Sequence, residues 1–343
     1  MSTFVTTKPT QELEPFKGVK KVPYEEYFTS GHRTCEGCES AQFMRLLAKA
    51  AGPRTIITGA TGCMYVANTS YYSTVWGVPW MHTQLGAAGS SALGTAAALR
   101  ALMRKGVFKD EPINVIAFCG DGGGADMGLA AISATLTHAD YNLLIVMYDN
   151  ETYANTDIQV SGTSPYGANT SFSTPGKLKR IMHNRWKKNV AGLMVAGHPK
   201  CKYVATVSTT YALQAMNAVR RALSIGGPTV IHCLNPCPKG WDFDPILSHE
   251  LGNLAVNTGI WPLYEVEKGV VKLYGKTRQI AEGRFKRLPV ADYLLKQGRF
   301  AHFTEEDIAY FQSQVDDMWN NWLVPGVIPL RKGPEEAATS TEQ

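Results

Sequence analysis

Two stretches, INVIAFCGDGG (113–123) and YNLLIVMYDNE (141–151), decide the fold class. Each contains an unbroken run of apolar residues, which is typical of a strand that is buried on both faces of a sheet. Between them, ADMGLAAISATLTHA (125–139) predicts a helix. A strand, a helix and a strand of these lengths form a βαβ unit with parallel strands.

The same alternation continues on both sides of this unit. TIITGA (55–60) predicts a strand, and LGAAGSSALGTAAALRALMRKG (85–106) predicts a helix whose small residues let a neighbour pack closely. YVATVST (203–209), YALQAMNAVRRALSI (211–225) and PTVIHCL (228–234) repeat the strand, helix and strand order. We therefore predict an α/β fold with a doubly wound parallel sheet.

The pattern changes after residue 243, and we divide the chain into four parts. Residues 1–22 predict an N-terminal arm that lies on another surface, and residues 23–243 the α/β domain. Residues 244–330 predict a C-terminal extension for packing or subunit contact. The polar residues 331–343 predict a disordered tail.

Two elements are predicted in the extension. WPLYEVEKGVVKLYG (261–275) predicts a hairpin or short strands. TEEDIAYFQSQVDDMWNNWLV (304–324) predicts an amphipathic helix with Thr304 as its N-cap. Its apolar stripe is typical of a core or subunit contact and consists of Ile308, Phe311, Val315, Met318, Trp319 and Trp322.

Composition and charge exclude several classes of protein. The chain has 343 residues and a formal net charge of +5, without the stripe of Lys and Arg that marks a nucleic-acid binder. Its densest basic run, RIMHNRWKK (180–188), predicts one solvated or partner-binding helix face. No signal peptide and no run of roughly 20 apolar residues that would span a membrane is visible. We expect a cytoplasmic protein.

The end of each central strand carries polar residues suited to a diphosphate. Glycines around Asp121 let the backbone approach an anion at a helix start, and a carboxylate beside a phosphate needs a cation between them. Mg²⁺ prefers such oxygen ligands. Asn150 and the carbonyl of Thr152 follow the next strand, at the same edge of a parallel sheet. Together they match a thiamine-diphosphate site, whereas Gly-Asp-Gly alone is a common turn.

A second chemical feature is the Cys-x-x-Cys pair in GHRTCEGCESAQ (31–42), in a chain with seven cysteines. Structural disulfides are rare in the cytoplasm. The pair alone is compatible with a disulfide, a redox dithiol, half of a zinc site or half of an iron–sulfur site.

The two features occur together in one family. The chain resembles the β subunit of the thiamine-diphosphate-dependent 2-oxoacid:ferredoxin oxidoreductases over residues 23–243. Six motifs appear in family order: GHRTCEGC (31–38), TGC (61–63), GDGGGADMG (120–128), DNETYANTDIQVSGTSPYGANT (149–170), PGK (175–177) and NPCPKGW (235–241).

The resemblance implies three cofactors: thiamine diphosphate, Mg²⁺ and a [4Fe–4S] cluster. By motif position the cluster ligands are Cys35, Cys38, Cys63 and Cys237. A cubane needs four thiolates, and a Cys-x-x-Cys loop provides two of them. The resemblance gives Asp121, Asn150 and the Thr152 carbonyl to the magnesium ion, and Asn155 to the substrate as the catalytic residue. It assigns the diphosphate to the backbone of Gly120, Gly122 and Gly123.

The implied reaction is oxidative decarboxylation of a 2-oxoacid, with coenzyme A as the acyl acceptor. Electrons leave singly through the cluster to ferredoxin, or to NAD through an NAD-reducing subunit. The family's β subunit lacks the glutamate that activates thiamine, so an α subunit is implied, together with γ and ferredoxin-like δ subunits. Such enzymes belong to anaerobic metabolism, and pyruvate, phenylglyoxylate and oxalate are candidate substrates.

Alternatives remain at this point. A four-cysteine zinc site would use the same ligands, although zinc motifs usually show two Cys-x-x-Cys pairs. A thioredoxin-type dithiol would leave Cys63 and Cys237 without a role. Cys233 competes with Cys237, whereas Cys119 is predicted as a buried hydrophobe and Cys201 as a bystander.

Two other functions fit the same motifs less fully. One is a non-redox thiamine enzyme, such as an acetolactate-synthase-like ligase, with a structural cysteine site. The other is an electron-transfer subunit that has lost thiamine, against which the intact Asp121 and Asn150 argue. His32 and His82 lie near motifs and have either a functional or a structural role.

The chain departs from the family pattern where substrate should lie. Glu39 replaces a glycine after the second cysteine, and Asp157 a glycine after "NT". Gly86 and Ala87 stand where the family has a Glu-Asn pair, and these small residues leave room for a bulkier substrate. NPCPKGW (235–241) favours the pyruvate-like branch over the 2-oxoglutarate branch.

Overall fold

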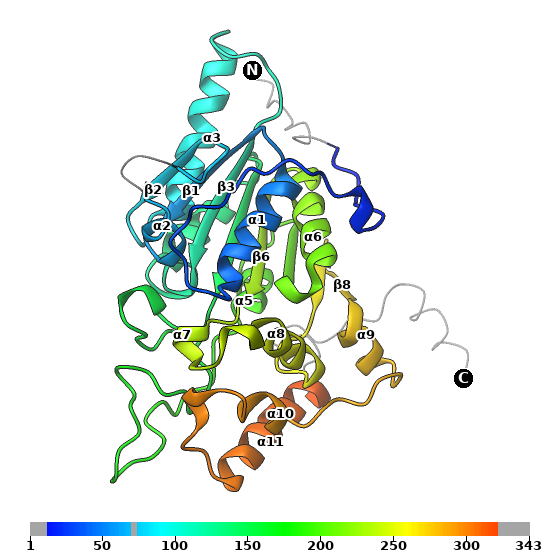
Figure 1. The fold of residues 1–343 in the computed structure, drawn as a ribbon. Coiled ribbons are helices and arrows are strands. Elements are labelled where there is room, and N and C mark those ends of the chain that lie inside the picture. Colours follow the sequence, from blue (N-terminus) through cyan, green and yellow to red (C-terminus); the bar gives the residue numbers. More distant parts are fainter. Residues whose placement is uncertain (1–11, 70–73, 322–343) are drawn as a thin grey trace, which may run out of the picture.

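The computed structural model describes residues 12–69 and 74–321 (Figure 1). In these residues one eight-stranded sheet has the order β2-β1-β3-β4-β6-β5-β7-β8. The first six strands in this order pair in parallel, and the last two are antiparallel. The strands are β1 (Thr55–Ala60), β2 (Trp80–Thr83), β3 (Asn114–Gly120), β4 (Leu143–Asp149), β5 (Tyr203–Ser208), β6 (Pro228–Leu234), β7 (Tyr264–Glu267) and β8 (Val270–Leu273).

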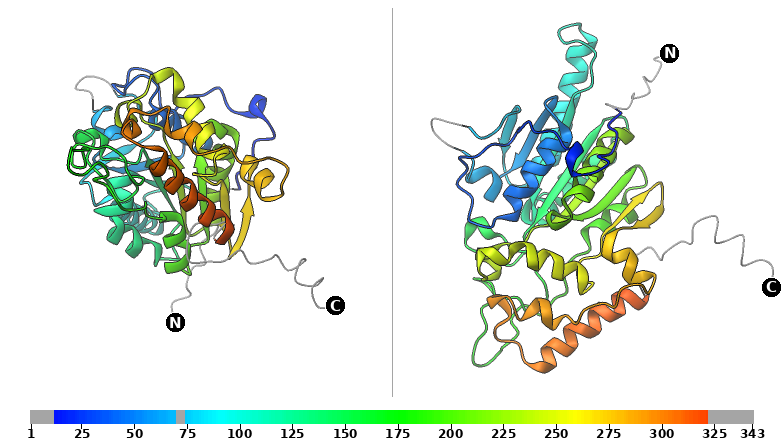
Figure 2. Two further views of the ribbon diagram at one scale, coloured as in Figure 1. Left: turned by 90° about the horizontal axis from the view of Figure 1, so that it is seen from below. Right: turned by 45° about the vertical axis from the view of Figure 1, so that its right-hand side comes forward.

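Helices cover both faces of the parallel part (Figures 1 and 2). The two cores lie on opposite faces: α1 (Glu39–Ala51) and α6 (Ala212–Ile225) enclose one, while α3 (Ala88–Arg104), α4 (Leu129–Leu136) and α5 (Val190–Gly197) enclose the other. Strand β3 shows why its apolar run is unbroken, since Phe118 enters the first core and Cys119 the second. The predicted doubly wound α/β fold is confirmed.

The remaining helices lie at the carboxyl edge of the sheet, below the strands in Figure 1. A third core there contains Trp241, Leu251 and Phe311. The helices are α7 (Pro238–Trp241), α8 (Ser248–Asn257), α9 (Gly275–Ala281), α10 (Ala291–Leu294) and α11 (Glu305–Asn321), with the 3₁₀ turns η5 (Pro245–Leu247) and η6 (Gly298–Phe300). Helix α2 (Cys63–Val66) and the turns η1 (Val19–Lys21), η3 (Ala154–Thr156) and η4 (Thr209–Tyr211) complete the elements described.

The extension forms the predicted hairpin and helix. The hairpin β7–β8 pairs antiparallel with β5, so it enlarges the sheet of the α/β domain. Thr304 and Asp307 cap α11 reciprocally: the Asp307 N–H donates to Thr304 Oγ1 at 3.4 Å, and the Thr304 N–H donates to Asp307 Oδ2 at 2.7 Å. The division of the chain near residue 243 stays a prediction.

Two local predictions were wrong. Residues 180–188 form no helix and run as an irregular segment along the surface. The helix predicted over 125–139 begins only at Leu129, because η2 (Gly122–Asp126) winds as a π-helix before it. The predicted tail 331–343 and Trp322 lie outside the described residues. Among the residues described, no helix has the length and apolar character needed to cross a membrane.

Candidate cofactor site at the carboxyl edge of the sheet

A cavity of about 170 Å³ lies between the ends of β3 and β4. Its lining brings together all the residues that the motifs indicate for thiamine diphosphate and magnesium. It is lined by Thr61, Gly62, Cys63, Leu85, Gly120, Asp121, Gly122, Gly123, Met127, Tyr148, Asn150, Thr152, Tyr153, Ala154, Asn155 and Thr156. Cys63 therefore shares one cavity with the proposed diphosphate residues.

The glycine turn is too crowded for side chains. A Cβ on Gly123 would lie 2.9 Å from the carbonyl oxygen of Leu85, and one on Gly122 would lie 2.9 Å from the ring of Tyr153. Gly122 and Gly123 are the first two residues of the wide π-helical turn η2, and both line the cavity. Glycine is required at both positions because Leu85 and Tyr153 of the same chain approach the turn so closely.

The negative charge of Asp121 is unfavourable at its buried position unless a cation binds there. It is buried, and desolvation together with the nearby Asp149 carboxylate raises the pKa of Asp121 well above its usual range. Thr163 Oγ1 lies 2.8 Å from Asp149 Oδ1 and 3.4 Å from Asp121 Oδ2, and its single proton cannot serve both. A bound divalent cation would remove this charge penalty.

Asn150 offers an unused oxygen at the same cavity. Its Oδ1 is buried and has no hydrogen-bond partner among the described residues. The backbone of Asn150 is held by a hydrogen bond, because the indole N–H of Trp241 donates to the Asn150 carbonyl at 2.8 Å. A buried amide oxygen without a partner is costly unless something binds it. Asn150 thus fits the part of a magnesium ligand.

The loop between Asn150 and Thr152 is held by Lys187 and Arg299, which lie outside the six sequence motifs. Glu151 has a left-handed backbone with φ of 60°, which is uncommon for a residue other than glycine. Its buried carboxylate accepts from Arg299 at 2.7 Å and from Lys187 at 3.0 Å. Arg299 also lies 4.0 Å from the centre of the Trp241 ring. Sequence spacing gives no sign of Arg299, which is 148 residues from Glu151.

The other candidates near the cavity differ in exposure. Asn155 lies in η3 with an exposed side chain at the cavity wall. His82 is exposed, and its Nε2 lies 2.9 Å from Thr61 Oγ1. His32 is stacked on Phe28 and lines a different cavity, together with Cys35 and Cys38. His32 does not line the cofactor cavity.

The four motif cysteines come from three distant parts of the chain. Cys38 is the N-cap of α1, Cys63 is the first residue of α2, and Cys237 is the N-cap of α7. Cys35 is exposed in the loop before α1. The thiol of Cys237 accepts the Gly240 N–H at 3.2 Å, an interaction that favours a thiolate.

Backbone contacts bring the Cys-x-x-Cys loop to the end of β6. Gly37 has φ of 65°, and a Cβ there would lie 2.6 Å from the Pro245 carbonyl oxygen. Its own carbonyl accepts from Ser248 Oγ at 2.7 Å, and Asn235 Nδ2 donates to the Glu39 carbonyl at 3.1 Å. The loop is therefore docked against η5 and α8, next to Cys237.

The other three motif thiols are close enough to Cys63 to influence its pKa. Burial raises the pKa of Cys63, and the charges of Cys237, Cys38 and Cys35 raise it further. Burial also raises the pKa of Cys237 to about 12. Among the described residues, no three His, Cys, Asp or Glu side chains converge on a point that would hold one metal ion. A cubane cluster instead takes each thiolate at a separate iron, so its ligands surround it.

The other three cysteines behave as small buried side chains. Cys119 and Cys233 are buried in the two cores on opposite faces of the sheet. Cys201 is partly buried against the second core, with its thiol 3.5 Å from the Tyr203 carbonyl oxygen. None of the three is among the groups that raise the pKa of Cys63.

Comparison with known proteins identifies several relatives. Residues 59–233 match the model of the thiamine pyrophosphate enzyme C-terminal TPP-binding domain. Pyruvate synthase subunit PorB of Methanocaldococcus jannaschii is 46% identical over 301 residues, covering 87% of this chain and 97% of that protein. Ketoisovalerate oxidoreductase subunit VorB of Pyrococcus furiosus is 34% identical, covering 90% of this chain and 96% of that protein.

A solved structure shares the fold. The 2-oxoglutarate:ferredoxin oxidoreductase of Magnetococcus marinus, with 2-oxoglutarate, coenzyme A and succinyl-CoA bound, aligns with a TM-score of 0.50 at 18% identity. The alignment covers 66% of this chain and 79% of the matched chain.

Proposed function

The chain belongs to the thiamine-diphosphate-dependent 2-oxoacid:ferredoxin oxidoreductases, as a β subunit of the PorB and VorB type, and we propose that it holds both cofactors of the reaction. The observation that carries this proposal is one cavity lined by the glycine turn, Asp121, Asn150 and Cys63. Carbon chemistry and electron removal would then take place side by side.

The cavity residues fit a magnesium diphosphate. Asp121 and Asn150 would bind the metal through side-chain oxygens, and Thr152 through its carbonyl. The backbone around Gly122 and Gly123 would contact the diphosphate, where a Cβ would collide with its surroundings. The pair of Glu151 with Arg299 anchors the loop between Asn150 and Thr152, which both line the cavity.

The four thiols fit a [4Fe–4S] cluster better than a single ion. Among the described residues, no three possible ligands converge on a single ion, and two of the four thiols belong to helix N-caps. When bound, thiamine diphosphate supplies the electron sink for decarboxylation and the cluster accepts electrons one at a time. All seven cysteines are free, which is consistent with our proposal of a cytoplasmic location.

We propose the overall reaction 2-oxoacid plus coenzyme A to acyl-CoA, carbon dioxide, one proton and two electrons. Ferredoxin, or NAD through another subunit, would take the electrons. Pyruvate is the first substrate to test, because the PorB relative is more similar than the VorB relative, at 46% against 34% identity. Asn155 at the cavity wall would contact the 2-oxoacid.

Partner subunits complete this site in the proposal. No glutamate is among the described residues that line the cavity, and in this proposal an α subunit supplies the activating carboxylate. Exposed Met127 and Asn155 at the cavity wall leave a surface for it. Additional γ and ferredoxin-like δ subunits would carry the electrons onward.

The experiment is to purify the native complex without oxygen and to assay iron, acid-labile sulfide and thiamine diphosphate. We expect about four irons and four sulfides per copy of this chain beyond those of partner subunits, with about one thiamine. Pyruvate and coenzyme A should then reduce a dye. Thiamine without iron, together with carboligation in the absence of an acceptor, would instead indicate a non-redox ligase.

A further inference from the structure

A buried turn at residues 161–164 lies beside the proposed magnesium ligands and lines no part of the cofactor cavity. Two hydrogen bonds close it: the Ser164 N–H donates to the Ser161 carbonyl at 3.2 Å, and the Ser161 N–H donates to Ser164 Oγ at 2.9 Å. Its three hydroxyl groups, on Ser161, Thr163 and Ser164, belong to buried side chains. Buried hydroxyls need partners, and these include the polar groups at the ends of β3 and β4.

The Thr163 hydroxyl stands between two carboxylates. Oγ1 lies 2.8 Å from Asp149 Oδ1 and 3.4 Å from Asp121 Oδ2. Threonine has one hydroxyl proton, and the shorter distance directs that proton to Asp149. The hydroxyl therefore separates the two acidic side chains while it binds one of them.

Asp149 is held on both of its oxygens. His232 Nε2 lies 2.7 Å from Oδ2, and the Glu151 N–H donates to Oδ1 at 2.8 Å. Together with Thr163, these groups enclose a side chain that is 0% exposed. Asp121 lines the cofactor cavity, whereas Asp149 does not. Of the two neighbouring carboxylates, one is satisfied inside the protein and the other is open to a ligand.

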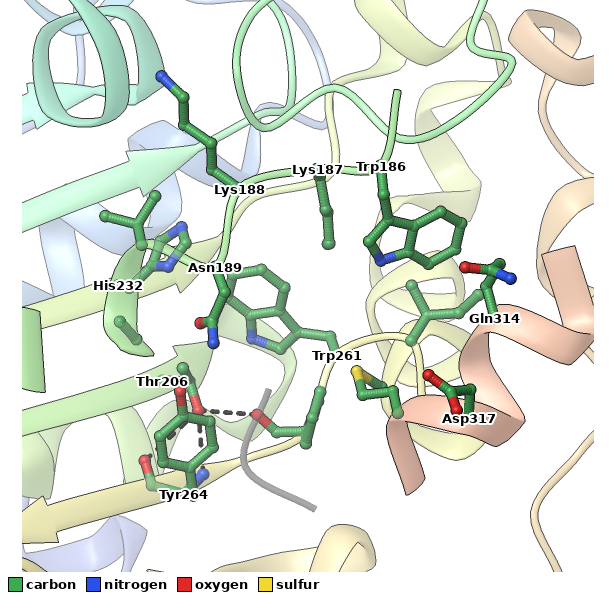
Figure 3. Close-up of a pocket in the computed structure, with 15 residues that line it drawn as sticks. Trp186, Lys187, Lys188, Asn189, Thr206, His232, Trp261, Tyr264, Gln314 and Asp317 are labelled. Carbon is green, nitrogen blue, oxygen red and sulfur yellow. Dashed lines mark hydrogen bonds between the residues drawn. The ribbon is translucent and has the colours of Figure 1, made fainter. Parts of the chain in front are cut away.

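His232 lies in the wall of a second cavity, of about 430 Å³ (Figure 3). Its ring meets the Trp261 ring edge-on, with the ring centres 4.7 Å apart. Lys187 lies 4.8 Å from the centre of the same indole ring and pairs with Glu151 at 3.0 Å. Residues packed on Trp261 thus hold both Asp149 and Glu151, and none of them lines the cofactor cavity.

The turn also holds the backbone between two proposed magnesium ligands. Ser164 Oγ donates to the Glu151 carbonyl at 2.6 Å, and Glu151 separates Asn150 from Thr152. Through Thr163 the same turn reaches the residue that follows β3. One short segment therefore contacts both strand ends that carry these ligands.

We propose that Thr163 is a positioning residue of the magnesium site, which holds Asp149 away from the cation and leaves Asp121 as the carboxylate that binds it. This inference rests on the proposed function, in which Asp121 is a magnesium ligand. Asp149 adds a second negative charge behind the site, and two neighbouring charges attract a divalent cation more strongly than one does. Outer partners of this kind contribute about 10–100-fold to metal affinity.

Manganese binding tests this role without catalysis. The native complex is freed of metal and thiamine diphosphate and titrated with Mn²⁺ at saturating thiamine diphosphate, while electron paramagnetic resonance measures free Mn²⁺. Thr163→Val keeps the shape and removes the hydroxyl, so it should weaken Mn²⁺ binding by about 10–100-fold. Thr163→Ser keeps the hydroxyl and should bind Mn²⁺ like the wild type. Thr135→Val removes a buried hydroxyl that is bonded within α4, and this control should also bind like the wild type.

The pattern across these variants separates a hydrogen bond from packing. A side chain that only filled space would tolerate valine and not serine, and that result overturns the inference. Equal Mn²⁺ binding by Thr163→Val and the wild type overturns it as well. A wild-type complex that binds no Mn²⁺ together with thiamine diphosphate overturns the proposed function and this inference with it.

Asp149→Asn tests the same contact from its other end and serves if Thr163→Val does not assemble. It keeps the shape of the side chain and removes the charge, so Mn²⁺ should bind about 10-fold more weakly. Unchanged Mn²⁺ binding by Asp149→Asn overturns the inference, because Thr163 would then have no outer carboxylate to position.

Discussion

The diphosphate cavity and the group of four cysteines are neighbours that the fold builds in different ways. One βαβ passage, from β3 through α4 to β4, places Asp121 and Asn150 at adjacent strand ends. The cysteines come from the loop before α1, the end of β1 and the end of β6. The first site needs only local topology, whereas the second needs several long-range contacts. A substitution in one site should therefore remove its own cofactor and leave the other bound, except where one residue supports both sites.

The largest expected effect concerns the diphosphate side alone. Asp121→Asn removes the buried carboxylate that we assign to Mg²⁺ and should weaken thiamine diphosphate binding by at least about 100-fold, since even outer partners of a metal contribute 10–100-fold. Iron content should stay at the wild-type level. Thiamine and iron assays on the purified complex measure both quantities, with the exposed Asp110→Asn as control. Loss of iron together with thiamine would show that the two sites are one cooperative unit.

The next change concerns the cysteine side alone. Cys237→Ser should lower bound iron by roughly 10-fold, because a hydroxyl is a poor ligand for iron in a cubane. Dye reduction should disappear while thiamine diphosphate still binds. Cys233→Ser is the matched control, since that thiol lies in a core and should retain iron at a stability cost of about 1–3 kcal/mol. The opposite pattern for the two variants would make Cys233 the ligand.

A third change tests Arg299, which contacts residues next to both sites. Arg299 holds Glu151 and packs on Trp241, which follows Cys237 in α7. Arg299→Met leaves the Glu151 carboxylate with Lys187 alone, and breaking a buried pair costs about 3–5 kcal/mol. We expect an unfolding transition at lower denaturant and thiamine diphosphate binding weaker by about 10-fold. The double variant with Glu151→Gln should recover much of the stability, and no recovery would argue against the pair.

The smallest expected effect tests how tightly the glycine turn packs against Leu85. Gly123→Ala places a Cβ 2.9 Å from the Leu85 carbonyl oxygen and should destabilise the protein by about 1–3 kcal/mol. Gly94→Ala in α3 meets nothing within 4 Å and should stabilise it by about 1 kcal/mol. Thermal unfolding of both variants gives the comparison. A neutral Gly123→Ala would mean that the turn has room to shift.

Much of the fold was predictable from short apolar runs. The strands of 113–123 and 141–151 are buried on both faces, so their composition indicates a parallel sheet directly. The segment 180–188 shows where composition alone does not determine secondary structure. Its basic residues suggested a helix face, but Lys187 and Lys188 instead reach Glu151 and Asp126 from an irregular segment.

The sequence by itself determined the central parallel strands β3 and β4, the glycine turn and the polar strand ends, because each depends on residues close together in one βαβ unit. Motif resemblance added the set of four cysteines. Only the tertiary structure decided that Cys63 lines the diphosphate cavity and that Arg299 supports Glu151. Contacts between residues that are far apart in the chain leave no periodicity in the sequence, since they depend on how whole layers pack. That the buried Oδ1 of Asn150 has no hydrogen-bond partner is likewise visible only in the folded structure, where the surrounding donors are positioned.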